Sequence, residues 1–157
     1  MAKVKLDRID RVIISQLLED GRMTNVELAE KAGISAPPCL RRVRALESTG
    51  IIKGYHAEVN ASMLGYAVIV FIQVGLENQH DDELQKFEKQ VQEWERVREC
   101  HLVSGDSDFL LKVVAKDWDD YQQFLTTRLT GTPNIKHIKS SMGVKTCKFA
   151  PGVPIEA

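Results

Sequence analysis

Four runs of strand length in the second half of the chain restrict its fold more than any other sequence feature. They cover residues 67–76, 97–103, 109–114 and 135–149, and the first of them is rich in β-branched residues. The first run, AVIVFIQVGL, is too short to span a bilayer and is typical of a strand that is buried on both faces. In the last run, Gly143 indicates a bulge or a bend.

Two helices are expected between these runs. The first has Asp81 or Asp82 as its cap, and its apolar stripe consists of Leu84, Phe87, Val91 and Trp94. The second is capped by Asp117, and its face consists of Trp118, Tyr121, Leu125 and Leu129. The order strand, helix, strand, strand, helix, strand predicts a ferredoxin-like βαββαβ domain with both helices on one face of an antiparallel sheet. Because the other face also needs cover, we expect a homodimer formed through the sheets.

The first half of the chain has the period of short helices. A helix is expected over residues 6–20 with Asp7 as its N-cap, and Thr24 with Glu27 forms a capping box at the start of a second helix. Gly33 then gives a tight turn before a third helix. Helix, glycine turn and helix is the arrangement of DNA-reading helix-turn-helix proteins, so the fold class is α+β with an N-terminal winged helix-turn-helix.

The third helix, residues 35–50, has two different sides. Ser35 is a candidate cap that accepts a bond from a first-turn amide, Pro37 and Pro38 suit the first turn, and Gly50 follows the last turn. Helical spacing places Leu40, Val43 and Leu46 on the core side, with Cys39 and Ala36 at its margins. The opposite side carries small residues and three arginines: Arg41, Arg42 and Arg44. Such a side fits the major groove, although a solvated face would have the same composition.

The remaining DNA contact expected from the sequence lies just after this helix. Gly54 indicates a bend between two short extended pieces, and the resulting wing would bring Lys53 near a phosphate. Lys53 could equally be solvated. The candidate DNA-binding residues are therefore Ser35, Pro37, Pro38, Arg41, Arg42, Arg44 and Lys53.

The composition and charge of the chain agree with this division into two parts. Residues 1–60 hold ten basic and eight acidic side chains, whereas residues 61–157 hold eleven and fourteen. We expect a helix-turn-helix domain over residues 1–56, a linker over 57–66, and a ligand-binding and oligomerisation domain over 67–157. The chain has no apolar leader or membrane span, so we expect a cytoplasmic protein. Its three cysteines, which lack CxxC spacing, are expected to be buried thiols.

Three stretches of this sequence closely resemble the Lrp/AsnC, or feast/famine, transcription regulators: LDRIDRVIISQLLEDGRMTNVELAEKAGIS, PPCLRRVRALESTGIIKGY and SGDSDFLLKV. The resemblance covers nearly the full chain. It implies a C-terminal domain that forms dimers, which often assemble into octamers, and an amino-acid effector that changes assembly and DNA affinity. It also matches Pro38, Leu40, Arg41 and Arg42 to the recognition-helix pattern.

The same resemblance matches Gly105 and Asp108 to the family's effector loop. The residues themselves suit this role, because Gly105 allows close approach of the backbone and exposed amides can hold a carboxylate. Asp106 or Asp108 can pair with an α-ammonium group. The candidate effector site is Ser104, Gly105, Asp106 and Asp108. A simple tight turn would have the same composition.

These features predict a sequence-specific DNA-binding transcription regulator that responds to a small effector, an amino acid. The alternative is an architectural DNA-binding protein that needs no effector. Two acidic residues at the start of a strand could also serve an enzyme or hold a metal ion. The sequence has no catalytic motif to accompany them, and its four histidines are scattered singly. We therefore expect no enzymatic activity, no metal and no cofactor.

Overall fold

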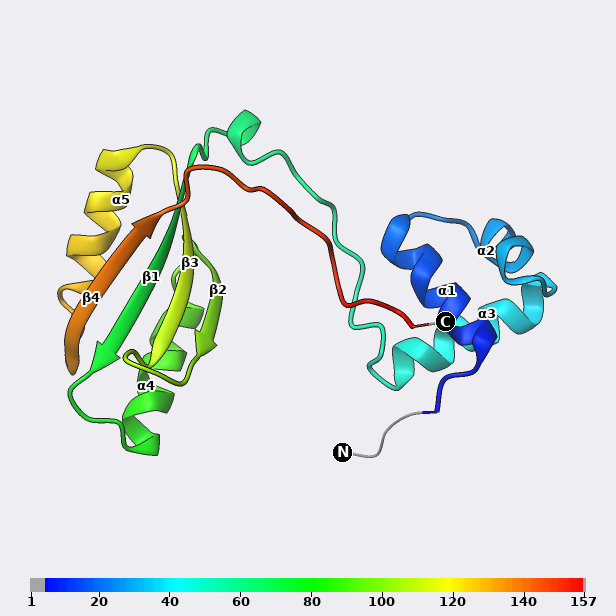
Figure 1. Cartoon of the computed structure of the whole chain (residues 1–157), viewed down its shortest axis with the longest axis horizontal. Coiled ribbons are helices and arrows are strands. Elements are labelled where there is room, and N and C mark those ends of the chain that lie inside the picture. Colours follow the sequence, from blue (N-terminus) through cyan, green and yellow to red (C-terminus); the bar gives the residue numbers. More distant parts are fainter. Residues whose placement is uncertain (1–4, 157) are drawn as a thin grey trace. The chain divides into compact units, whose positions relative to one another are not determined.

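The computed structural model describes residues 5–156, which form two compact units (Figure 1). The first unit contains the described residues of Met1–Glu58 and Lys148–Ala157, and the second is Val59–Cys147. Each unit has its own hydrophobic core. The domain boundaries expected from the sequence stay a prediction, and the compact units group the C-terminal segment with the first half of the chain.

The first unit contains the three expected helices: α1 (Arg8–Glu19), α2 (Asn25–Ala32) and α3 (Ala36–Ser48). Asp7 caps α1 and forms a capping box with Asp10, and Thr24 forms the predicted capping box with Glu27. Gly33 ends α2 at a φ of 69°, a conformation in which glycine is free of the Cβ clash. The three-helix arrangement is confirmed.

The C-terminal segment packs against α1 within this unit. Ile155 lies against the core cluster that contains Ile13, and Gly152 approaches Leu18 closely at a φ of 68°. The Arg11 guanidinium donates from Nη1 to the carbonyl oxygen of Glu156 over 2.8 Å. This segment therefore adds apolar cover to a unit that is small for a stable core.

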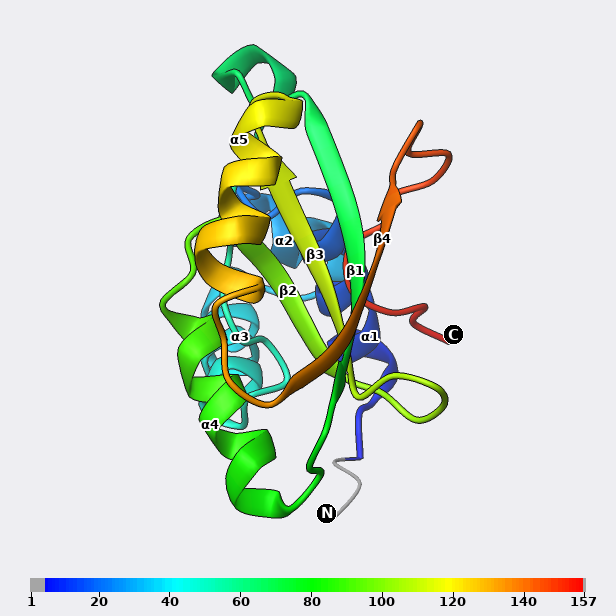
Figure 2. The same cartoon turned by 90° about the vertical axis from the view of Figure 1, so that its left-hand side faces the viewer.

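The second unit has a four-stranded antiparallel sheet in the order β2-β3-β1-β4. Its strands are β1 (Val68–Leu76), β2 (Val97–Leu102), β3 (Phe109–Ala115) and β4 (Ile135–Met142). The helices α4 (Asp81–Gln92) and α5 (Trp118–Phe124) cover one face, as Figure 2 shows. A π-helical turn, Leu125–Leu129, extends α5, and a 3-10 turn, Ser62–Leu64, precedes the sheet. The ferredoxin-like prediction is confirmed.

The core of this unit lies between the sheet and the two helices. Val70, Ile72 and Val74 are buried there, whereas Phe71 on the opposite face of β1 is 41% exposed. The expectation that this strand is buried on both faces is therefore wrong for the single chain. The alternation has a simple cause, because successive side chains of a strand point to opposite faces and only one face has helices over it.

Two element boundaries differ from the sequence-based prediction. The last strand ends at Met142 and not at residue 149, because its partner β1 begins only at Val68. Gly143 still donates its N–H to the Ile69 carbonyl over 2.8 Å. Helix α4 begins at Asp81, so Asp81 and Asp82, the expected cap residues, lie in its first turn. Carboxylates there interact favourably with the positive end of the helix dipole.

Two expectations about side chains also fail. Trp118, placed on the apolar face of α5, is 54% exposed. Of the cysteines, Cys39 is buried, Cys100 is half-buried and Cys147 is exposed, so they are not all buried thiols. Within residues 5–156, no helix is both long and apolar enough to cross a membrane.

Candidate nucleic-acid interface and effector loop

Helix α3 begins without the expected side-chain cap. Ser35 occupies the N-cap position in an extended conformation, but its hydroxyl accepts no capping bond among the described residues. An N-cap side chain accepts from the amide at the second or third helical position. Those positions are Pro37 and Pro38, which have no N–H. The prediction that Ser35 accepts such a bond is therefore wrong, and the two prolines are the reason.

The buried side of α3 is rotated relative to the predicted one. Cys39 is fully buried and Leu46 is 4% exposed, whereas Leu40 is 37% exposed and lies at the margin. The opposite side therefore has Arg41 and Arg44 exposed on it. Within the described part of the chain, neither guanidinium is paired with a carboxylate. These two arginines are the positive groups that α3 presents to solvent.

Arg42 lies differently, at the edge between the buried and exposed sides. Its Nη1 is 2.7 Å from Asp7 Oδ2 and 2.8 Å from Asp10 Oδ1. These two hydrogen bonds raise the pKa of Arg42, and the bond to Asp10 has the larger effect. The pKa of Asp7 is lowered, chiefly by the backbone N–H of Asp10 and then by Arg42. Arg42 thus joins α3 to the start of α1.

Two further contacts hold the neighbourhood of α3, and sequence reasoning missed both. The Asn25 side chain donates to the Ala36 carbonyl over 2.9 Å, which ties α2 to the first turn of α3. Tyr55 donates its hydroxyl to Glu47 over 2.9 Å, and burial, with Glu47 second, raises the pKa of this phenol to about 12. No local signal marks these pairs, because each residue is of a type that is common at a helix start, in a helix or in a loop.

The segment after α3 places Lys53 on the surface. The described residues 51–60 contain no strand, so the predicted wing is an irregular segment and not a β-hairpin. Of the other candidate residues, Ser35 and Pro37 are exposed and Pro38 is half-buried. Ser35, Pro37, Arg41 and Arg44 are thus exposed, whereas the Arg42 side chain is half-buried and engaged with two carboxylates.

The candidate effector loop connects β2 to β3 and is held by Asp108. The backbone N–H of Asp108 donates to the Val74 carbonyl over 2.9 Å, and its carbonyl accepts from Val103 over 2.8 Å. Its carboxylate Oδ2 accepts the Leu76 N–H over 2.7 Å. One carboxylate oxygen of Asp108 therefore anchors the loop to the end of β1.

The rest of this loop is open to solvent. Ser104, Gly105 and Asp106 are exposed, and Gly105 has a φ of 130°, which favours glycine. Beside the loop, the Ser107 hydroxyl lies 3.4 Å from Nε2 of His137. The His137 ring lies over Gly75, where a Cβ would overlap it. Sequence reasoning missed His137, since only the strand register places it opposite Gly75.

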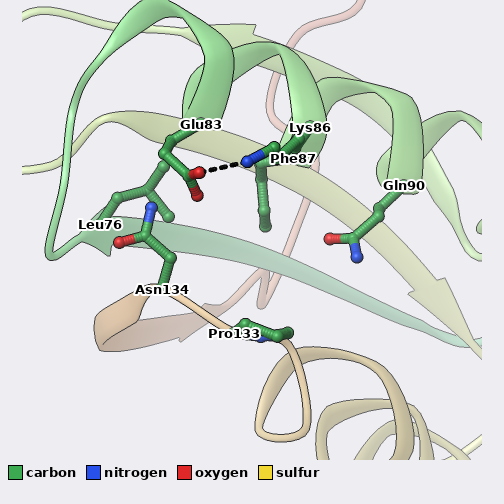
Figure 3. A pocket seen from close by; sticks show the side chains of 7 residues that line it. All are labelled: Leu76, Glu83, Lys86, Phe87, Gln90, Pro133 and Asn134. Atoms are coloured by element: carbon green, nitrogen blue, oxygen red, sulfur yellow. Dashed lines mark hydrogen bonds and ion pairs between the residues drawn. The ribbon is translucent and has the colours of Figure 1, made fainter.

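A pocket of about 300 Å³ lies between α4 and the end of β1, on the helix side of the sheet (Figure 3). Its floor includes Leu76 and Phe87, both 3% exposed. Glu83 and Lys86 form an ion pair on α4 at its rim, and Asn134 lies across from them. Leu76 thus contributes its side chain to this pocket and its N–H to Asp108 in the loop.

The structure gives no support to the metal alternative. Within residues 5–156, no group of three or more His, Cys, Asp and Glu side chains could hold a metal ion. Cys100 pairs with Leu111 and His101 with Leu110. As predicted, these two side chains lie on opposite faces of β2.

Two families match successive parts of the chain. Residues 6–53 match the family described as winged helix-turn-helix DNA-binding, and residues 69–153 match the Lrp/AsnC ligand binding domain. The first match contains all three helices of the first unit. The second match contains the sheet from the second residue of β1 onward and the candidate effector loop.

Similar proteins span the same length. The chain is 48% identical to the leucine-responsive regulatory protein of Rhizobium meliloti (strain 1021), over 99% of each protein. It is 41% identical to the Bkd operon transcriptional regulator of Pseudomonas aeruginosa, over 96% of this chain and 99% of that protein. A Neisseria meningitidis transcriptional regulator, solved as an L-Met complex, has a TM-score of 0.90 and 31% identity over 96% of this chain and 97% of its own.

A second solved structure, the AsnC family transcriptional regulator from Agrobacterium tumefaciens, has a TM-score of 0.89 and 30% identity, over 95% of this chain and 97% of that chain. Full-length relatives, both domain matches and the fold therefore agree. The chain belongs to the Lrp/AsnC family of transcription regulators, with a helix-turn-helix DNA-binding domain followed by a ligand-binding domain.

Proposed function

We propose that this regulator reads double-stranded DNA with the outer side of α3, and that an amino acid at the loop of residues 104–108 changes its DNA affinity or its assembly. The observation that carries the proposal is the pair of exposed arginines, Arg41 and Arg44, on the side of α3 away from the core. The cytoplasmic location expected from the sequence stays a prediction.

The outer side of α3 has the chemistry of a groove-reading surface. Ala45, the residue after Arg44, is small and exposed, so the helix backbone can approach the base edges there. Arg41 lies centrally and can pair bidentately with guanine O6 and N7. Arg44, and Lys53 from the next segment, would contact phosphates. Ser35, Pro37 and Pro38 lie at the start of the helix, where a groove-inserted helix meets the duplex.

The effector proposal rests on the open part of the loop. Ser104 and Asp106 are exposed, and Gly105 leaves its backbone accessible. Asp108 uses Oδ2 for Leu76, which leaves Oδ1 to pair with an α-ammonium group. Support also comes from the Neisseria meningitidis regulator, which was solved as an L-Met complex. An amino acid has both the carboxylate and the ammonium group that such a loop can hold.

A homodimer through the sheet, which can assemble further to an octamer, is part of the same proposal. The open face of the sheet carries half-buried or exposed apolar side chains, namely Ile69, Phe71, Leu110 and Val114. A second copy of this face would cover them, since isologous contacts bury the same patch on both partners. A dimer also supplies two copies of α3 for two DNA half-sites. Sedimentation velocity at micromolar concentration tests this, and a stable monomer would contradict it.

Fluorescence anisotropy tests the function itself. The protein is titrated at one fixed salt concentration into its own upstream region and into a scrambled duplex of the same length, with and without each of the twenty amino acids. A preference for the upstream region that one or a few amino acids change is the expected result. Equal affinity for both duplexes, unmoved by any amino acid, would favour the architectural alternative.

A matched pair of variants tests the position of the effector. Asp106→Asn removes a charge from the loop, and Glu83→Gln removes a charge from the pocket beside α4. Both residues belong to the same unit. We expect only Asp106→Asn to weaken amino-acid binding in isothermal titration calorimetry. The opposite result would place the effector in the pocket of Figure 3.

A further inference from the structure

We propose that Arg42 is a positioning residue, which holds α3 against the start of α1 and thereby sets the orientation in which Arg41 and Arg44 meet DNA. This inference rests on the proposed function. It replaces the DNA contact that the sequence pattern assigns to Arg42 with an internal contact. Three residues form this Arg42 clamp: Arg42, Asp7 and Asp10.

The two carboxylates of the clamp are themselves held in place. Asp7 Oδ1 accepts the Asp10 N–H over 2.9 Å, and Asp10 Oδ2 accepts the Asp7 N–H over 3.2 Å. Each carboxylate then uses its other oxygen for Arg42, at 2.7 Å and 2.8 Å. Arg42 therefore contacts a preformed capping box and not two mobile surface side chains. Such an anchor loses less side-chain entropy than an ordinary exposed ion pair.

Burial and charge also separate Arg42 from its neighbours. The side chains of Arg42 and Asp10 are 34% and 17% exposed, and Arg41 and Arg44 are exposed. One guanidinium with two carboxylates has a net charge of −1, so the clamp as a whole repels a phosphate. A phosphate contact by Arg42 would require it to leave both carboxylates. The geometry thus favours a contact that orients the helix.

The clamp has a counterpart at the beginning of the helix. The Asn25 side chain donates to the carbonyl of Ala36, the first residue of α3. Helix α3 is therefore joined to α2 at its start and to α1 at its middle. Arg41 directly precedes Arg42 in the sequence. If loss of the clamp let α3 rotate, the guanidinium of Arg41 would move relative to the base edges. Because base-edge contacts carry the sequence preference and phosphate contacts do not, we expect such a displacement to reduce the preference more than the overall DNA affinity.

The decisive variant is the double substitution Asp7→Asn with Asp10→Asn. Asparagine is as good an N-cap as aspartate, so α1 keeps a cap while the clamp loses both charges. We expect the affinity for the upstream duplex to fall about fivefold relative to the scrambled duplex, the equivalent of one partly buried ion pair. The salt slope of binding should stay unchanged. Arg42→Ala should lower the same ratio, and the combined variant should lower it no further.

A phosphate contact predicts the opposite result. Removing the two carboxylates would release Arg42 and remove two negative charges, so affinity for both duplexes would rise and the salt slope would steepen by about 0.9 for the new phosphate contact. Glu30→Gln, an exposed charge elsewhere in the same unit, is the control for the charge change alone. Circular dichroism on each variant checks that the helices are intact.

Three outcomes overturn the inference. The first is tighter binding by the double variant with a steeper salt slope. The second is an unchanged ratio of the two affinities in a folded variant, because the clamp would then be a stabilising contact without a role in reading DNA. The third is a wild-type protein without any preference for its upstream region, which overturns the proposed function as well and is recognised by that wild-type result.

Discussion

The anchor that Asp108 provides for the effector loop leads to a prediction about two substitutions at one position. Its carboxylate accepts the N–H of Leu76, a residue only 3% exposed. Asp108→Ala leaves that N–H without a partner, which costs about 1–3 kcal/mol in the free energy of unfolding. Asp108→Asn keeps an oxygen at the same place and removes only the charge. We expect Asn to recover most of the stability that Ala loses.

Thermal unfolding followed by circular dichroism measures this difference. For a unit of this size, a loss of about 2 kcal/mol corresponds to a melting temperature lower by roughly 10 °C. Calorimetric titration with the amino acid found in the anisotropy screen then separates the two roles of Asp108. We expect Asp108→Asn to bind the amino acid weakly although it is folded, because an amide attracts an ammonium group less than a carboxylate does.

Two results would refute this reasoning. If Asp108→Ala unfolded at the wild-type temperature, the bond to Leu76 would not hold the loop. If Asp108→Asn bound the amino acid as tightly as the wild type, the ammonium group would have another partner. Basal DNA binding should survive in both variants, because the Asp108 contacts lie within the second unit.

Further predictions concern the recognition helix, the thiols and the C-terminal segment. Arg41→Ala should cost about 1–3 kcal/mol on the upstream duplex and relax its sequence preference in anisotropy titrations; unchanged affinity in a folded protein would show that α3 faces DNA differently. Burial raises the pKa of the Cys100 thiol to about 11, so this thiol stays protonated at pH 8 and gains reactivity only as the pH approaches 11. Exposed Cys147 should therefore react first with iodoacetamide at pH 8, as mass spectrometry can show, and equal rates would contradict the burial. Gly152→Val forces a β-branched residue into a positive φ at a cost of about 1–2 kcal/mol, so hydrogen exchange in α1 should accelerate, whereas Val153→Ala, at a 68% exposed neighbour, should leave it unchanged.

Local sequence signals predicted most of the elements because their causes are local. The capping boxes at Asp7 and Thr24 each join residues three positions apart, and Gly33 ends its helix through its own backbone conformation. The hydrophobic periods of the second half gave the order of strands and helices, from which the sheet topology follows. Where a local rule failed, at Ser35, the reason was also local, since Pro37 and Pro38 lack the amide that a cap needs.

The candidate site depends on contacts that no local pattern contains. Arg42 meets carboxylates 32 and 35 positions earlier, and Asp108 meets an amide 32 positions earlier. His137 lies by Gly75 only because the register of β1 and β4 pairs these positions. Helical spacing alone placed the buried side of α3 about one residue away from its actual position. The packing of Cys39 against the core determines which side is buried.

The sequence by itself thus determined the elements, their order and the family, because caps, turns and hydrophobic periods act between neighbours in the chain. Only the tertiary structure decided which arginines face solvent, which carboxylate oxygens are already engaged and where the C-terminal segment packs. Those outcomes depend on pairs of residues that are distant in the chain, and the packing of complete elements brings these pairs together.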